Sequence, residues 1–195
     1  MTKTFGVRAV LAGLMVLSMA GCFVRSSKNA NGDKDVNITT PLGGMSVQTD
    51  EANVVSKIGL PVYPGATPHK KDGDNNGSAD VDMNFGAFHL RVLAAVYDSA
   101  DAPAQVETFY RKALSQYSDV IACQGKVPVG TPVKTGLGLT CSDNDHRNTK
   151  VKHGDDDSEV ELRAGSPSRQ HIVAYKPAGA GTVVSLISLD LPRDN

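Results

Sequence analysis

Apolar and polar residues alternate along much of this chain, and alternation with a period of two predicts strands that bury one face. The clearest case is the stretch from Phe88 to Val96, in which every second residue is apolar. Related patterns predict strands over 36–40, 45–49, 119–124, 133–141, 158–164, 170–176 and 182–191. The first two of these segments flank Pro41-Leu42-Gly43-Gly44, which predicts an N-terminal hairpin.

Helical periodicity is concentrated in a single longer segment. Its apolar side chains recur with the spacing of one helix face, at Val106, Phe109, Tyr110, Ala113, Leu114 and Tyr117. We expect Asp101 to cap this helix and Pro103 to lie in its first turn. A short helix from Asp50 to Ile58, ended by Gly59, is also predicted. One main amphipathic helix packed against a mostly antiparallel sheet is an α+β fold, which buries the apolar face of both elements.

The first residues of the chain have the pattern of an export signal. Two basic residues precede an apolar run from Ala9 to Ala20, which is too short to span a bilayer and is typical of a signal-peptide core. The run ends in Leu17-Ser18-Met19-Ala20-Gly21-Cys22, which resembles the lipobox of bacterial lipoproteins, with Met19 where that family usually has leucine. The resemblance implies cleavage before Cys22 and attachment of a diacylglycerol to that cysteine. Ordinary secretion is the alternative, because Ser18-Met19-Ala20 also suits a general signal peptidase.

These signals divide the chain into three parts. Residues 1–21 are the predicted signal peptide, and residues 22–35 have few apolar side chains and are predicted to form a flexible, lipid-anchored tether. Residues 36–195 are predicted to form a single domain with its core over about 60–191. Without residues 1–21 the chain has 18 basic and 21 acidic residues, a net charge of −3. We therefore expect a membrane-anchored lipoprotein of the cell envelope or, if Cys22 is not acylated, a soluble secreted or periplasmic protein.

Cys123 and Cys141 remain as a pair if Cys22 carries the lipid. They enclose 17 residues that are rich in glycine and proline. An exported protein folds in an oxidising compartment, so we expect a disulfide between them, which stabilises the fold by about 3 kcal/mol in the chain-entropy model. Two buried thiols in neighbouring strands are the alternative. A zinc site is disfavoured, because neither cysteine is accompanied by the usual cysteine or histidine spacing.

The order of the segments is similar to that of a known group of proteins. Val62-Tyr63-Pro64-Gly65-Ala66, a long strand and then Phe109-Tyr110 in the helix resemble exported bacterial proteins with a "YPGA…FY" core. The resemblance spans residues 36–191 and implies a small envelope domain of α+β fold. It implies no catalytic residue, since no activity of that family can be transferred.

Composition excludes several function classes. The chain has 20 basic and 21 acidic residues, a formal charge of −1, so it lacks the basic balance with which proteins grip nucleic acid. It contains no tryptophan and 5% aromatic residues, which disfavours a platform for stacking bases or sugars. No arrangement of residues meets the requirements of a catalytic site. We therefore predict a protein without enzyme activity or cofactor.

One segment has the spacing of a calcium-binding loop. Residues 72–80 match D-x-D-x-N-G with a further aspartate at the ninth position, and the candidate ligands are Asp72, Asp74, Asn76 and Asp80. The twelfth position is Met83, where a bidentate carboxylate normally completes the coordination shell. We therefore expect a solvated loop without a tight calcium site. The stretch 143–157, which contains two histidines and five aspartates, is also predicted to be a solvated loop, because its histidine spacing fits no zinc motif.

Two function classes are compatible with these sequence features. The first is a non-catalytic binding or structural module of the envelope, which is held at the membrane by its lipid and binds an unknown protein, glycan or lipid. The second is a small-ligand or Ca²⁺-dependent sensor domain that uses the Asp72–Asp80 loop.

Overall fold

The computed structural model describes residues 22–28, 33–70, 77–142 and 158–192. Their elements are β1 (Phe23–Lys28), β2 (Lys34–Thr40), β3 (Gly43–Gln48), α2 (Glu51–Ile58), β4 (Thr67–Pro68), β5 (Ser78–Phe85), β6 (Phe88–Ser99), α3 (Pro103–Leu114), β7 (Ile121–Gln124), β8 (Val127–Pro128), β9 (Val160–Ser166), β10 (Arg169–Ala178) and β11 (Gly181–Asp190).

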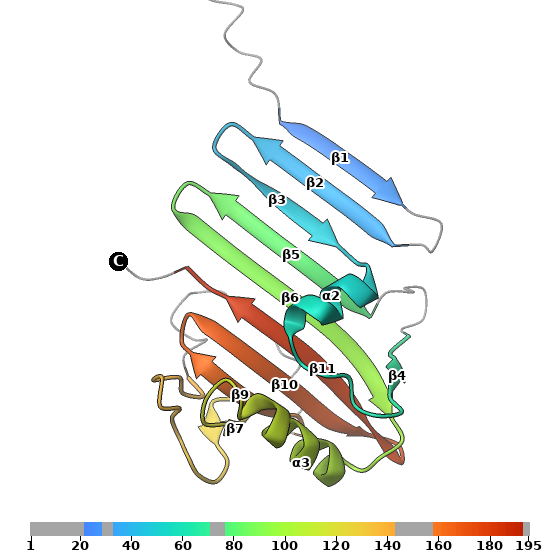
Figure 1. The fold of residues 1–195 in the computed structure, drawn as a ribbon, viewed down its shortest axis with the longest axis vertical. Helices are drawn as coiled ribbons and strands as arrows, with labels where there is room; N and C mark the ends of the chain where they lie inside the picture. Colours follow the sequence, from blue (N-terminus) through green and yellow to red (C-terminus); the bar gives the residue numbers. More distant parts are fainter. Residues whose placement is uncertain (1–21, 29–32, 71–76, 143–157, 193–195) are drawn as a thin grey trace, which may run out of the picture.

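All the described strands belong to one antiparallel sheet (Figure 1). Its order is β1-β2-β3-β5-β6-β11-β10-β9-β7-β8, and the short strand β4 pairs with the end of β6. Most neighbours in the sheet are also neighbours in the sequence, and β6 joins the N-terminal strands to the C-terminal ones through β11. The mostly antiparallel α+β fold expected from the sequence is therefore confirmed.

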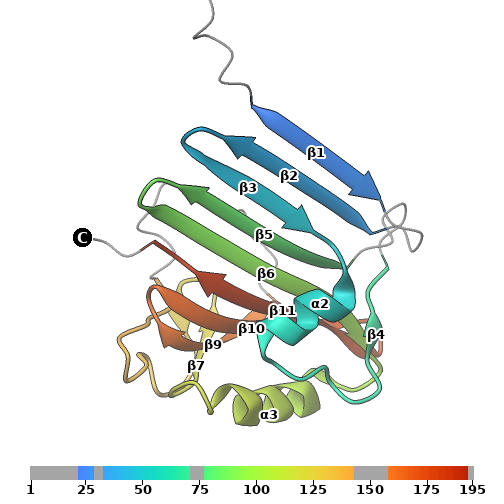
Figure 2. The ribbon, with the colours of Figure 1, turned by 45° about the horizontal axis from the view of Figure 1, so that its top comes forward.

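Two helices pack on the same face of the sheet (Figure 2). Helix α2 lies over β5, β6 and β11, and helix α3 lies over β9, β10 and β11. The sheet is thus covered by a pair of helices, of which α3 is the longer. Neither of them is long and apolar enough to cross a bilayer.

The ends of the helices follow local rules, with one correction. Asp50 caps α2 by accepting a hydrogen bond from the backbone N–H of Asn53 at 2.8 Å, and Gly59 ends the helix with a φ of 76°. Helix α3 begins at Pro103 as expected, but the prediction that Asp101 caps it is wrong. The carboxylate of Asp101 instead accepts a hydrogen bond from the Tyr63 hydroxyl at 2.7 Å.

The core lies between the helices and the sheet. In β6, the buried residues Leu93, Ala95 and Tyr97 alternate with the half-buried residues Val92, Ala94 and Val96, so the two faces of this strand have different surroundings. The fully buried side chains that α2 and α3 contribute are Val54, Ile58, Val106, Tyr110 and Leu114. The predicted apolar stripe of α3 therefore faces the sheet.

Tyrosine hydroxyls tie both helices to the sheet. Tyr97 of β6 donates a hydrogen bond to Glu51 of α2 at 2.9 Å, and Tyr175 of β10 donates one to Glu107 of α3 at 2.6 Å. Burial and the hydrogen bond to Glu51 raise the pKa of Tyr97. Burial opposes ionisation of Glu107, but the hydrogen bonds from Tyr175 and Arg111 outweigh it and hold the pKa of Glu107 below its usual value. Each hydroxyl therefore stays protonated and donates to a carboxylate.

Three segments differ from the sequence-based expectation. Residues 23–28 form strand β1, paired with β2, instead of part of a flexible tether. Residues 78–85 form strand β5, which sequence reasoning missed because the first of them were interpreted as part of the calcium loop. Residues 133–141 contain an isolated bridge between Lys134 and Thr140 in place of a strand, because the glycines within them favour turns.

Replacing Gly43 tests the pairing of β3 with β5. A Cβ atom at this position would lie 1.9 Å from the backbone oxygen of Asn84, and the φ of 153° is unfavourable for other residues. We expect Gly43→Ala to lower the free energy of unfolding by about 1–3 kcal/mol from overpacking alone.

Gly65→Ala is the matched control, measured by urea denaturation. Gly65 also has a positive φ, of 78°, but a Cβ atom there meets nothing within 4 Å. Gly65→Ala should therefore lower the free energy of unfolding by only about 1–2 kcal/mol, through backbone strain. If Gly65→Ala destabilised the protein more than Gly43→Ala, the close approach of β3 and β5 would be incorrect.

Candidate binding surface

Of the four calcium-loop candidates, Asp80 is the one that the structure describes. Asp80 lies in β5 with its side chain 5% exposed, and both of its carboxylate oxygens are engaged. The Arg91 guanidinium donates to Oδ1 at 3.1 Å and to Oδ2 at 2.8 Å, and Lys57 Nζ donates to Oδ2 at 3.0 Å. Asp72, Asp74 and Asn76 lie outside the described residues. The Asp80 carboxylate is thus neutralised by two cations and does not act as a calcium ligand in this arrangement.

These charges form a network at the edge of α2. Burial pushes the pKa of Asp80 upward, but the hydrogen bonds from Arg91 and Lys57 prevail and lower it. Asp82 lies on the same face of β5, with its carboxylate 3.9 Å from Arg91 Nε and 3.6 Å from His89 Nε2. The network joins α2, β5 and β6, so it holds the helix over the sheet. Among the described residues, no group of three potential ligands is placed to hold a metal ion.

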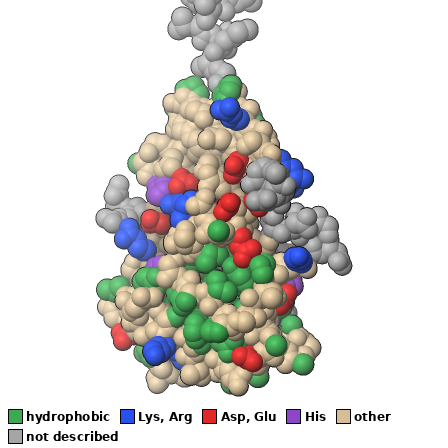
Figure 3. Space-filling view, turned by 45° about the vertical axis from the view of Figure 1, so that its right-hand side comes forward, with side chains coloured by type: hydrophobic (Ala, Val, Ile, Leu, Met, Phe, Trp, Pro, Cys, Tyr) green, Lys and Arg blue, Asp and Glu red, His purple; other side chains and the backbone are tan. Residues whose placement is uncertain are grey.

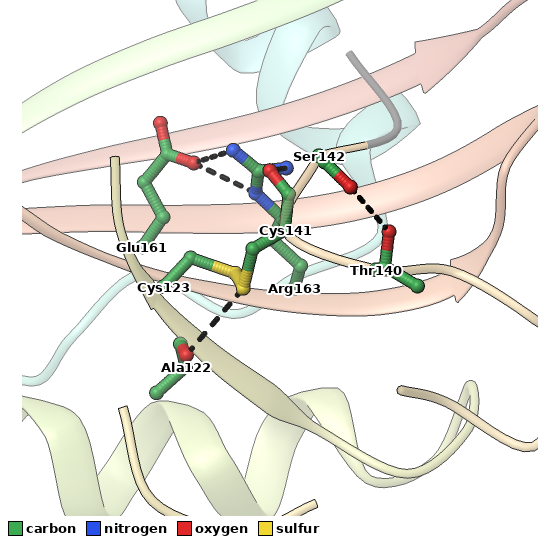
Figure 4. Close-up of a disulfide and its surroundings, with 7 residues drawn as sticks. All are labelled: Ala122, Cys123, Thr140, Cys141, Ser142, Glu161 and Arg163. Carbon is green, nitrogen blue, oxygen red and sulfur yellow. Dashed lines mark hydrogen bonds and ion pairs between the residues drawn. A yellow bond between two sulfur atoms is a disulfide. The ribbon is translucent and has the colours of Figure 1, made fainter. Parts of the chain in front are cut away.

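Cys123 and Cys141 form the expected disulfide (Figure 4). Their Cα atoms lie 5.6 Å apart, and the bond joins β7 to the loop that follows β8. Beneath it, Arg163 donates to the Cys141 carbonyl at 3.2 Å and forms a buried ion pair with Glu161 on the same strand. The disulfide and this ion pair together fix the loop against β9.

The hollows on the surface of the described residues include the following two. One, of about 240 Å³, adjoins Tyr117 and His171, whose rings stack with centroids 3.6 Å apart. Burial lowers the pKa of His171, so its ring is neutral at physiological pH. The other, of about 290 Å³, lies over β1, β2 and β3 between Arg25 and Gln48. Both are smaller than the roughly 300–1,000 Å³ that is usual for small-molecule sites.

The most extensive candidate is the face of the sheet that lies opposite the helices, which we call the open face. Side chains alternate along each strand, so cross-strand partners of Val92 share its face. One row across β2, β3, β5, β6 and β11 consists entirely of aliphatic residues, Val36, Val47, Val81, Val92 and Leu189. A second row, across β1, β2, β3, β5 and β6, consists of Val24, Ile38, Met45, Met83 and Leu90.

These two rows are incompletely buried. Val24 is exposed and the other nine residues are half-buried, whereas their neighbours on the helix side of β6 are buried. On the same side of the sheet, described residues of the disulfide-linked loop cover β9, because Arg163 shares a face with Ile172 and Ile187 and contacts Cys141. The described residues thus cover one end of this side and leave the six strands that carry the two rows, about 24 Å in width, open. Contiguous apolar surface of this extent is characteristic of an interaction site.

Sequence reasoning predicted β2, β3, β6 and β11 of the open face but missed β1, β5 and the face itself. The strands alternate, and alternation is ordinarily interpreted as one buried and one solvated face. The available signal was that both parities of β6 are apolar, from Val92 to Val96. Such a strand is covered on both sides in most folds.

Cys22 directly precedes β1 and is the free cysteine of the described residues. It is exposed at the beginning of the edge strand. Its thiol is therefore accessible and is joined to the sheet without an intervening loop.

Replacing Asp80 tests the charge network. Because the pKa of Asp80 is lowered in the folded protein, the carboxylate stabilises the fold above its ordinary pKa and loses this effect as the pH falls through the lowered value. We expect Asp80→Asn to reduce the free energy of unfolding by about 1.5–3 kcal/mol at neutral pH, with a smaller difference from the wild type in acid. Asp82→Asn is the control, and its longer contacts with Arg91 and His89 predict a smaller loss. Equal losses in both variants at every pH would refute the assigned role of Asp80.

Comparisons with known proteins give no family for this chain. No family model matches it, and neither a curated protein nor a solved structure is significantly similar. A function for this protein must therefore be inferred from its own residues and geometry.

Proposed function

We propose that this protein is an exported, lipid-anchored envelope protein whose open face binds the apolar surface of another envelope protein. It acts as a non-catalytic binding module. The observation that carries this proposal is the pair of apolar rows, each of which crosses five strands, on the side of the sheet opposite the helices.

The envelope location is supported by two features of the cysteines. The apolar run before Cys22 ends with the small residues Ala20 and Gly21, as a lipobox requires. Cys123 and Cys141 are joined in a disulfide, a bond that persists in oxidising compartments such as the periplasm and is rare in the cytosol. An acylated Cys22 leaves no unpaired thiol in the chain, since these are its three cysteines.

The chemistry of the open face indicates the kind of partner. Its two rows contain no charged side chain, so the matching surface should be apolar at its centre. Lys28 and Lys34 face each other across β1 and β2, and the alternation of side chains places both on the open side, at its edge. Acidic residues at the rim of the partner would complement these two cations.

Removing the acylated cysteine tests the anchor. Wild-type protein expressed in a bacterium should partition into the detergent phase and carry the mass of a diacylglycerol, whereas Cys22→Ala should carry no lipid. Intact mass spectrometry of both proteins is the measurement. Identical partitioning and no acyl mass on the wild type would disprove the lipid anchor.

Two adjacent substitutions in β2 test the open face. Ile38 lies in the second apolar row, and Asn37 lies on the opposite side of the same strand and is exposed. After cross-linking in intact cells, we expect Ile38→Lys to lose the partner captured by the wild type, because a charge interrupts the apolar row. Asn37→Lys adds the same charge to the other face and should retain the partner. Equal capture by both variants would contradict binding through the open face.

A further inference from the structure

Large hydrophobic side chains are exposed together at one end of the sheet. We call this group the apolar tip, and its members are Phe23 (66% exposed), Val24 (62%), Leu42 (82%), Phe85 (42%) and Phe88 (40%). Figure 3 shows hydrophobic side chains at the β1 end of the molecule. Exposed aromatic and aliphatic residues that gather in this way indicate a surface that is covered by a partner.

Strand register places the members of the tip at the same end of neighbouring strands, with Phe23 on the helix side of the sheet and the other three strand residues on the open side. Thr40 pairs with Gly43 around the turn that carries Leu42, and Gly43 pairs in turn with Phe85. Phe85 pairs with Phe88 around the next turn, and the backbone N–H of Gly86 donates to the Leu42 carbonyl at 3.2 Å. The two hairpin turns are therefore neighbours at the same edge, on the left in Figure 1.

The same edge contains the start of β1. Phe23 pairs with Thr39, which is one residue from the end of β2, and Cys22 is the residue before Phe23. Because residues 23–28 form a strand and not a tether, a lipid on Cys22 would be joined directly to this end of the sheet. No linker separates Cys22 from β1, so acyl chains inserted in the bilayer would hold the tip at the membrane surface.

We propose that the apolar tip inserts into the interfacial layer of the lipid bilayer, next to the acylated Cys22. This inference rests on the proposed lipid anchor. Phenylalanine and leucine are the residues that amphipathic elements bury about 5–10 Å into the boundary between headgroups and acyl chains. The insertion adds a second point of contact to the lipid and so fixes the orientation of the sheet. The strands then rise from the membrane, and the open face points sideways toward neighbouring envelope proteins.

Fluorescent labels at two hairpin turns test the insertion. Acylation of Cys22 and the Cys123–Cys141 disulfide leave an introduced cysteine as the free thiol for labelling. Leu42→Cys places an environment-sensitive label in the tip. Ala180→Cys places it at the matching position of the two-residue turn between β10 and β11, which is exposed at the other end of the sheet. Both lipidated proteins are reconstituted in vesicles of phosphatidylcholine and phosphatidylglycerol.

We expect the label at residue 42 to shift its emission to shorter wavelength and to lose intensity when brominated lipids are included. The label at residue 180 should do neither. Adding Phe85→Ser and Phe88→Ser to Leu42→Cys should reduce the shift, because the aromatic pair supplies part of the insertion. If intact mass shows acylated protein but the two labels give the same water-like emission, the insertion is refuted and the anchor stands. If the protein carries no acyl mass, the anchor and the insertion are both refuted.

Discussion

Strand β6 is the element on which the rest of the structure depends. It pairs with β5 along one edge and with β11 along the other, and so it joins two groups of strands that are separate in the sequence. Its buried side chains Leu93, Ala95 and Tyr97 form the floor of the core beneath α2. Its other parity is also apolar, which places part of the hydrophobic surface on the side that neither helix covers. A sheet with two apolar faces and helices on one of them leaves, among the described residues, the second face for the proposed partner.

The charge network around Asp80 lies where the apolar part of the helix side of the sheet ends. Beneath α2, the helix side of the sheet is apolar at β6, but in β5 the same side carries Asp80 and Asp82. A buried carboxylate would be costly there without partners, and Lys57 of the helix and Arg91 of β6 supply them. From β5 to β1 the helix side is polar apart from Phe23 at the start of β1, whereas the open face stays apolar through both rows. In the order of the strands from β6 to β1, the helix side thus changes from apolar to polar, whereas the open face remains apolar.

The proposed anchor, apolar tip and open face form a consistent arrangement. Cys22 and the tip lie at one end of the strands, and the apolar rows run across those strands. A domain held at this end stands upright on a membrane and presents the open face to proteins beside it. The disulfide-linked loop lies at the far edge of the sheet, near β7 and β9, where it stabilises the strands that are most distant from β1.

The sequence by itself determined the features that depend on local pattern. Alternation predicted β6, β10 and β11, and the helical stripe from Val106 to Leu114 predicted α3, because each pattern is contained within one element. Gly59 also predicted where α2 ends. The oxidising compartment expected for an exported protein predicted the disulfide between Cys123 and Cys141. Only the tertiary structure decided that residues 23–28 are a strand, that Asp80 is held by Lys57 and Arg91, and that Val36 and Leu189 share one apolar row. Each of these depends on partners that are distant in the chain, and the register that joins them is set by the whole sheet and not by any single segment.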